Sequence, residues 1–248
     1  MPLGQPNPEP YLRSLLVCHD PAGDPNEYPY NVPAVRLTSD LKLHDKVTYF
    51  VGENGSGKST LLEAIAMLEG FNAEGGTRNF RFETTPANER LKYLVRVARG
   101  PRGKLRRDSF FFRAESFFNV VSEIERLGVG GAYGPRSLHE VSHGEALLAL
   151  MTHRLRGGGL YLFDEPESAL SPQRQLMFLR AVHDLIENDS QLIICTHSPI
   201  ILSYPDALIY EFSAEGVRPI AYEDTEHVRV TRTFLERRER MLHELFSD

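Results

Sequence analysis

The sequence of 248 residues lacks several features that would place it in a special class of protein. It has no tryptophan and only two cysteines, Cys18 and Cys195, so it is not a small secreted domain held together by disulfides. No apolar run approaches the roughly 18 residues needed to cross a membrane. The proline-rich residues 1–10 also differ from a secretory signal. We therefore expect a cytoplasmic protein with two free thiols and no membrane partner.

The sequence also has little excess charge. Its 28 Lys and Arg against 34 Asp and Glu give a formal net charge of −6, which argues against a protein that binds polyanions over its whole surface. The distribution is uneven, because residues 78–113 contain 11 basic and 3 acidic residues. That segment carries +8 and the rest of the chain −14, so a local basic patch remains compatible with the composition.

What the sequence does contain is an alternation of short apolar runs with longer amphipathic stretches. This pattern is typical of an α/β fold with a largely parallel sheet. Strands are expected at 12–18, 34–37, 47–51, 110–112, 160–163 and 192–195, a hairpin at 207–222, and helices at 59–69, from 142, from 171 and at 225–246. We predict one domain over residues 1–248, with a flexible segment 1–10, a basic antiparallel β-lobe 78–113 and a small helical lobe 114–158.

The strongest motif is G-x-x-x-x-G-K-[ST], which lies between a predicted strand and a predicted helix as a phosphate-binding loop requires. Its glycines allow backbone N–H groups to turn toward phosphates, and the helix N-terminus adds partial positive charge. We expect the lysine to reach the β- and γ-phosphates and the following serine to bind Mg²⁺. The predicted contacts are Gly52, Glu53, Asn54, Gly55, Ser56, Gly57, Lys58, Ser59 and Thr60.

Two further apolar strands end in residues with catalytic chemistry. The first delivers Asp164 and Glu165 to the edge of the sheet where ligands bind in open α/β folds. Asp164 suits the surroundings of Mg²⁺, and Glu165 suits polarisation of an attacking water. The second strand ends before His197, for which we predict a contact with the γ-phosphate.

In this order, the motifs resemble those of the ATP-binding cassette (ABC) ATPases. A signature-like segment at 141–145 lies between the phosphate loop and Asp164, and residues 168–171 resemble a D-loop. The resemblance implies a P-loop NTPase fold with an ABC-ATPase-like mixed sheet flanked by helices, and Mg-ATP as the ligand. The chain looks most similar to the soluble predicted ATPases related to recombination-type and anti-phage ABC proteins.

The signature departs from the family's LSGGQ at His143 and Glu145. Ser142 and Glu145 also form a capping box, so the segment has a purely structural interpretation as the start of a helix. In the family, the serine and its neighbouring glycine contact the nucleotide held by the other subunit. The resemblance therefore implies that Ser142 and Gly144 take part in a homodimer with ATP sandwiched between head-to-tail protomers.

The chain lacks the glutamine that the family places between the phosphate loop and the signature. Its glutamines are Gln5, Gln173, Gln175 and Gln191. After the strand at 110–112 stands Glu115, whose carboxylate can accept from a metal-bound water as an amide oxygen does. We take Glu115 as the candidate replacement, with a surface acid as the alternative. The adenine-stacking residue is open between His19, Tyr28 and Tyr30.

Between Lys92 and Arg107 lie seven basic residues and no acid. We interpret them as one face of a hairpin turned at 100–103. That face would attract nucleic acid; the alternatives are a solvated surface and a dock for an acidic partner. The residues proposed for nucleic acid are Arg96, Arg99, Arg102, Lys104, Arg106 and Arg107.

Together these observations predict an ATP hydrolase that dimerises around Mg-ATP and acts as a nucleotide-driven switch in DNA maintenance or defence. Glu165, His197 and Lys58 are its expected catalytic residues, and Ser59, Asp164 and Glu115 its expected metal-site residues. The alternatives are an ATP-gated binding module for DNA or a protein partner with little turnover, and the nucleotide-binding subunit of a transporter.

Overall fold

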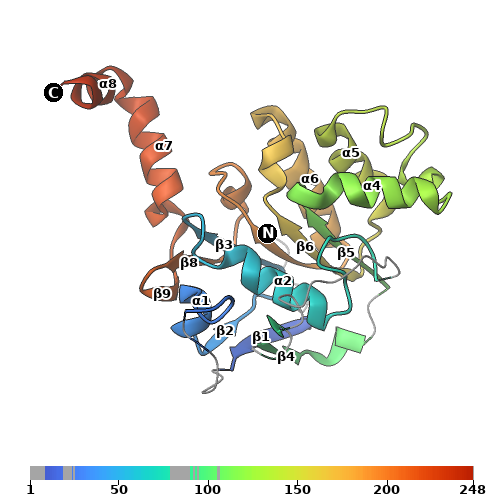
Figure 1. Cartoon of the computed structure of the whole chain (residues 1–248). Coiled ribbons are helices and arrows are strands. Elements are labelled where there is room, and N and C mark those ends of the chain that lie inside the picture. The colour runs from blue at the N-terminus through green and yellow to red at the C-terminus, as the bar shows by residue number, and fades with distance from the viewer. Residues whose placement is uncertain are drawn as a thin grey trace, which may run out of the picture.

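The computed structural model describes residues 9–18, 24, 26–78, 90–91, 93, 95–104 and 107–247, and all statements below concern these residues. Figure 1 shows a body of sheets and helices from which the C-terminal helices extend to one side. The mixed α/β architecture confirms the fold expected from the sequence.

The main sheet has six strands in the order β5-β6-β7-β3-β8-β9. The first five run parallel, and β9 is antiparallel to β8. β6 and β7 are buried along their whole length, as expected for apolar strands covered on both faces. The strands are β3 (Val47–Gly52), β5 (Asp108–Arg113), β6 (Gly159–Asp164), β7 (Gln191–Cys195), β8 (Leu208–Ser213) and β9 (Gly216–Pro219).

A second, three-stranded antiparallel sheet has the order β2-β1-β4, formed by β1 (Leu12–Val17), β2 (Asp40–Lys42) and β4 (Val95–Arg99). The sequence predicted an antiparallel addition to the main sheet, formed by a basic hairpin with its turn at 100–103. The prediction of that hairpin is wrong. β4 pairs with β1, whereas the next strand, β5, pairs in parallel with β6. The basic segment therefore runs from one sheet to the other.

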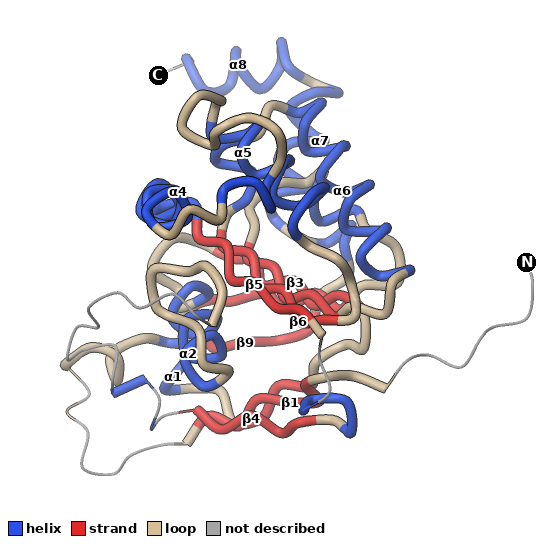
Figure 2. Tube along the Cα trace, turned by 90° about the vertical axis from the view of Figure 1, so that its right-hand side faces the viewer, coloured by secondary structure: helices blue, strands red, loops and turns tan. Residues whose placement is uncertain are grey.

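The helices cover both faces of the main sheet and enclose two apolar cores. One core lies between the sheet and α4, α5 and α6. The other lies between the sheet, α2 and β1, so α2 is sandwiched between two sheets, as Figure 2 shows. The helices are α1 (Pro33–Arg36), α2 (Lys58–Leu68), α4 (Phe117–Arg126), α5 (His143–Ala149), α6 (Pro172–Glu187), α7 (Glu226–Glu236) and α8 (Arg238–Phe246).

Two predicted elements are wrong. Residues 34–37 were expected to form a strand, but residues 34–36 belong to the short helix α1 and Leu37 is its C-cap. Pro33 occupies a first-turn position that suits its fixed φ. The single helix expected at 225–246 is divided at Arg237, whose φ of −132° and ψ of 35° are not helical. The other predicted strands and helices lie where they were expected, within a few residues.

Candidate functional site

The loop between β3 and α2 turns at glycines that no other residue could replace without strain. Gly52, Gly55 and Gly57 have φ values of 140°, 80° and 103°. A Cβ atom on Gly57 would lie 2.4 Å from Cγ1 of Val32, and one on Gly52 would lie 2.1 Å from the carbonyl oxygen of Phe212. The loop is thus held in a tight turn that leads directly into the N-terminus of α2.

Lys58, the first residue of α2, is a buried cation inside this loop. Its Nζ donates to the carbonyl oxygens of Gly52 at 2.7 Å and Glu53 at 2.9 Å. Burial lowers the pKa of Lys58, while the nearby carboxylates of Asp164 and Glu165 oppose that shift. An anion in the loop would give this ammonium a charged partner in place of neutral carbonyl groups.

Ser59 and Asp164 are 105 positions apart in sequence and in direct contact. The Ser59 hydroxyl donates to Oδ1 of Asp164 at 3.0 Å. Asp164 is buried at the end of β6. Burial raises its pKa, and the hydrogen bond from Ser59 opposes that rise. A hydroxyl and a carboxylate are oxygen ligands of the kind Mg²⁺ prefers, so the pair fits a cation held together with a nucleotide phosphate.

Arg113 is a residue of this site that the sequence analysis missed. It ends β5 directly opposite Asp164 in the β5–β6 register, with its Nε 3.8 Å from Oδ2 of Asp164. Its guanidinium also lies 3.6 Å from Oε2 of the buried Glu63 and 3.3 Å from Oε2 of Glu115. One cation thus joins three carboxylates and limits their repulsion beside the phosphate loop.

Glu115, the candidate replacement for the missing glutamine, follows β5 on a short 3-10 turn. Its side chain is 83% exposed and paired with Arg113. It does not line the described cavities beside the phosphate loop. Its role at a metal site therefore remains a prediction.

Glu165 is held in an unusual backbone conformation, with φ 51° and ψ 52°. Its N–H donates to the carbonyl of Cys195 at 3.0 Å, and the Ser168 hydroxyl donates to its carbonyl at 2.9 Å. A left-handed conformation is costly for glutamate, and residues strained in this way cluster at functional sites. The side chain is 43% exposed and shares an open cavity with Glu53, Asn54 and His197.

His197 follows β7 and lies beside Glu165, with its Nε2 3.7 Å from Oε1 of that residue. Its backbone N–H donates to Oε1 of Glu167 at 2.5 Å. Its Nδ1 is 2.9 Å from Nε2 of His227, on the first turn of α7. Burial, the charge of Lys58 and His227 lower the pKa of His197 to about 4, so the ring is neutral near pH 7.

A cavity of about 370 Å³ beside the loop is the candidate nucleotide site. Tyr28 lines it together with Lys58 and Glu165. Burial raises the pKa of Tyr28, and a hydrogen bond with Thr60 opposes that shift. Tyr30 instead packs against the core, and His19 lies outside the described residues. Of the three candidates for stacking adenine, Tyr28 is the one that the cavity includes.

The signature-like segment forms the capping box that its sequence indicates. The backbone N–H of Glu145 donates to Oγ of Ser142, and Glu145 accepts from the backbone N–H of Ser142 at 2.9 Å. Arg174 of α6 donates to Oγ of Ser142 at 3.1 Å and to Oε1 of Glu145 at 3.0 Å. A Cβ atom on Gly144 would lie 2.4 Å from the Ala169 carbonyl oxygen, so the D-loop-like segment packs directly on the start of α5.

Ser142 and Gly144 do not line the described cavities beside the phosphate loop. The structure therefore brings Lys58, Ser59 and Asp164 together with Glu165 and His197, but not with the signature-like segment. The contact of Ser142 and Gly144 with nucleotide remains a prediction, and it requires a second protomer.

Several of the basic residues have acidic partners. Arg99 pairs with Glu69 at 2.8 Å, and Arg102 lies 3.8 Å from Asp189 and over the ring of Tyr11. Arg107 is exposed at a cavity of about 820 Å³ whose charged lining is mixed, with Arg102, Arg154 and Arg156 beside Asp108, Glu187 and Asp189. Arg96 is exposed on β4. The part of the chain that the structure describes does not include Arg106, Lys92 or the side chain of Lys104.

Other expectations concern metal clusters, thiols and membranes. Within the described ranges, no group of three or more His, Cys, Asp or Glu is arranged to hold a metal ion. Cys18 and Cys195 are free thiols. No helix in the part of the chain that the structure describes is long and apolar enough to cross a membrane.

Comparison with known proteins relates this chain to several P-loop ATPases. The family described as "AAA domain, putative AbiEii toxin, Type IV TA system" matches residues 81–203, and a second AAA domain family matches residues 35–107. Two solved structures are similar to this chain, each with 18% sequence identity and a TM-score of 0.47. The SMC head domain from Thermotoga maritima aligns over 85% of this chain and 99% of that chain, and MJ1267, an ATP-binding cassette of an ABC transporter, over 96% and 99%.

Curated relatives are ATP-binding proteins. The macrolide export ATP-binding/permease protein MacB of Campylobacter jejuni is 26% identical over 64% of this chain, but that alignment spans only 27% of MacB. The L-cystine transport system ATP-binding protein TcyN of Escherichia coli is 26% identical over 77% of this chain and 87% of its own length. The matches to AAA domains and to ATP-binding proteins agree with a lysine-bearing loop beside Asp164, and the chain resembles the P-loop ATPases of the ABC type.

Proposed function

We propose that this protein binds Mg-ATP at the phosphate loop, dimerises around two nucleotides and hydrolyses them as a nucleotide-driven switch. The observation that carries the proposal is the hydrogen bond between Ser59 and Asp164, because it brings the loop to the strand that delivers Glu165. Proteins of this type bind ATP, generally with Mg²⁺. The cation would be held by Ser59 and Asp164 and would neutralise phosphate charge.

The chain's own residues have distinct roles in this proposal. Lys58 binds the terminal phosphates from inside the loop. Glu165, exposed at the cavity, orients the attacking water and accepts its proton. His197 donates a hydrogen bond to the γ-phosphate from Nε2, a buried atom with no hydrogen-bond partner among the described residues. Burial raises the pKa of Asp164, and the hydrogen bond from Ser59 and the charge of Arg113 oppose that rise.

The dimer places Ser142 and Gly144 on the nucleotide of the other protomer. Support comes from the separation of these residues from the phosphate loop of their own chain and from the exposed N-terminus of α5, which suits a phosphate. Arg174 contributes a positive charge at the same place. A complete ATP site then needs two chains.

The substitution Glu165→Gln tests this proposal. It removes the base but keeps the size and hydrogen-bonding capacity of the side chain, so ATP binding is retained and turnover falls by roughly 10²- to 10⁴-fold. The variant should also accumulate as an ATP-dependent dimer. Steady-state ATPase assays and light scattering check both outcomes, with Glu239→Gln, which removes an exposed carboxylate on α8, as the control. Unchanged hydrolysis in Glu165→Gln would remove Glu165 from its role.

The output of the switch has two candidates that different observations favour. The exposed Arg107 and Arg156, at a cavity lined by four arginines and three acidic residues, favour a nucleic-acid partner, in line with a role in DNA maintenance or defence. The transport ATP-binding proteins among the relatives favour a transporter subunit. Pull-down with the Glu165→Gln protein and ATP separates the two, because co-purified nucleic acid supports the first candidate and a co-purified membrane protein the second.

A further inference from the structure

We propose that His227, at the start of α7, is a positioning residue for His197. A hydrogen bond from His227 occupies Nδ1 of His197 and leaves Nε2–H of His197 as the ring donor that faces the nucleotide cavity. The inference rests on the proposed function, because it concerns how His197 meets a phosphate.

The contact between the two histidines is close and specific. Nδ1 of His197 lies 2.9 Å from Nε2 of His227, and the ring planes meet at 63° with centroids 4.9 Å apart. The backbone of His197 is fixed separately by Glu167. Its other ring nitrogen, Nε2, is buried without a hydrogen-bond partner among the described residues, on the side of Glu165 and the cavity. One nitrogen is therefore occupied, and the other lacks a hydrogen-bond partner among the described residues.

Only one arrangement of protons suits an anion in that cavity. Burial lowers the pKa of both histidines, so each ring is neutral near pH 7 and a single proton lies between them. If that proton were on His197, Nε2 of His197 would turn a lone pair toward the phosphate. If it is on His227, Nδ1 of His197 is the acceptor and Nε2 carries the donor. His227 thus selects the tautomer that can bind a γ-phosphate.

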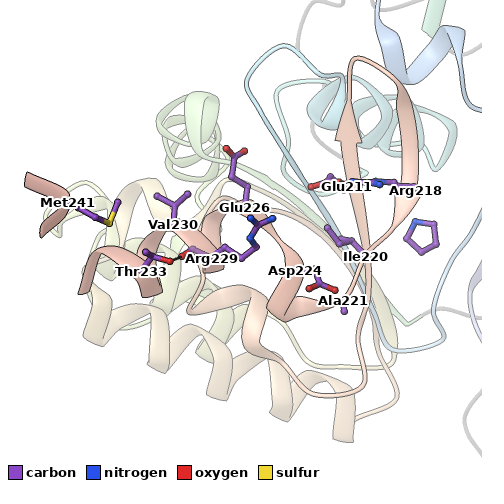
Figure 3. A pocket seen from close by; sticks show the side chains of 11 residues that line it. Glu211, Arg218, Ile220, Ala221, Asp224, Glu226, Arg229, Val230, Thr233 and Met241 are labelled. Carbon is purple, nitrogen blue, oxygen red and sulfur yellow. Dashed lines mark hydrogen bonds and ion pairs between the residues drawn. The ribbon is translucent and has the colours of Figure 1, made fainter. Parts of the chain in front are cut away.

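The first turn of α7 is well placed to act on the loop that carries His197. The Tyr222 hydroxyl donates to the carbonyl of Pro199 at 3.1 Å. Thr225, the residue directly before α7, is fully buried. Val228 is the one buried residue of α7. Other residues of this helix line a cavity of about 760 Å³. Figure 3 shows Glu226, Arg229, Val230 and Thr233 of α7 along this cavity, opposite Glu211 and Arg218 of the β8–β9 hairpin. A displacement of α7 would therefore move His227 and, through it, His197.

Kinetics of three variants test the role. His227→Leu should lower kcat by about 10- to 100-fold, the usual effect of losing the outer partner of a ligating histidine, with KM for ATP within about twofold. His227→Gln should restore most of kcat, because its amide N–H can donate from nearly the same position. Val230→Ala, an exposed change one turn along α7, should leave both constants unchanged. An unchanged kcat in His227→Leu, or no recovery in His227→Gln, overturns the inference.

NMR on the ¹⁵N-labelled wild-type chain without nucleotide tests the hydrogen bond itself. A coupling between the two ¹⁵N nuclei across the bond, with the proton attached to Nε2 of His227, is expected. A proton attached to Nδ1 of His197, or no coupling, refutes the inference. Because this measurement needs no turnover, absence of the coupling in an active enzyme overturns the inference alone. An inactive wild-type protein with the coupling overturns the proposed function alone.

Discussion

At the scale of single residues, the site is a set of charges that burial has made sensitive to their neighbours. Burial raises the pKa of Asp164 and Glu63 and lowers that of Lys58 and His197. Each shift disfavours the charged form. Charged neighbours oppose it at Asp164, Glu63 and Lys58, whereas at His197 burial and the charge of Lys58 outweigh the Glu165 carboxylate, whose Oε1 lies 3.7 Å from Nε2. His197 is therefore the group whose protonation conflicts most directly with the folded site.

This conflict predicts a dependence of stability on pH. An unfolded histidine titrates near 6.5 and His197 in the fold near 4. Between these values the unfolded chain binds a proton that the folded chain does not, so its contribution to stability is present above pH 6.5 and is lost as pH falls toward 4. Urea unfolding at pH 7 and pH 5 should show a larger loss for wild type than for His197→Asn. Equal losses in the two proteins would contradict the lowered pKa.

Most residues of the site could be predicted because each one follows an apolar strand. Lys58, Asp164 and His197 come together since the carboxyl ends of parallel strands meet at one edge of a sheet. Arg113 and His227 could not be predicted. The role of Arg113 depends on the parallel pairing of β5 with β6, which the sequence analysis had assigned to an antiparallel lobe. His227 reaches His197 only because the β8–β9 hairpin returns the chain to the segment that follows β7.

At the scale of elements, α5 has a structural and a functional interpretation that rest on the same atoms. Its cap joins Ser142, Glu145 and Arg174, and its N-terminus is exposed. The capping box could be predicted from spacing alone. The contribution of Arg174 could not, because it depends on how the starts of α5 and α6 pack around Gly144.

Two substitutions at Ser142 separate these interpretations. Ser142→Ala removes the cap and should lower the free energy of unfolding by about 1 kcal/mol. Ser142→Asn keeps a good capping oxygen, so its stability should stay close to wild type, while the larger side chain should weaken ATP-dependent dimerisation. Urea unfolding measures the first effect, and sedimentation velocity with ATP measures the second. If Ser142→Asn dimerises like wild type, the segment is only a cap.

Errors among the predicted elements arise where the local sequence pattern does not decide the structure. Four residues at 34–37 are too few for periodicity to separate a strand from a helical turn, and tertiary packing against α2 and β8 decides. The division between α7 and α8 at Arg237 carries no glycine or proline signal. The basic segment was expected to pair with itself, but β4 pairs with β1, about 80 positions earlier in sequence. Such nonlocal pairing is not encoded in the pattern of either strand.

At the scale of the whole molecule, the two sheets and α2 hold the phosphate loop rigidly, while the residues expected to complete the site lie elsewhere. The apolar cores on both faces of the main sheet fix the loop, Asp164 and His197 relative to one another. Ser142 lies outside the described cavities around that loop. Under the proposed function, Ser142 therefore completes the ATP site of another copy of the chain.

Mixing two inactive variants tests that arrangement directly. Lys58→Met cannot bind the terminal phosphates, and Ser142→Asn cannot complete the neighbouring site, so each homodimer should be inactive. In a two-fold dimer, a mixed pair contains one site with both residues intact and one with neither. An equimolar mixture should therefore recover about a quarter of the wild-type rate, since half of the dimers are mixed and each has one working site.

The measurement requires protein concentrations at which a single intact site holds the dimer together. A mixture of Lys58→Met with the doubly substituted chain is the matched control and should stay inactive. No recovery in the first mixture, or activity of Ser142→Asn alone, would mean that each chain completes its own site.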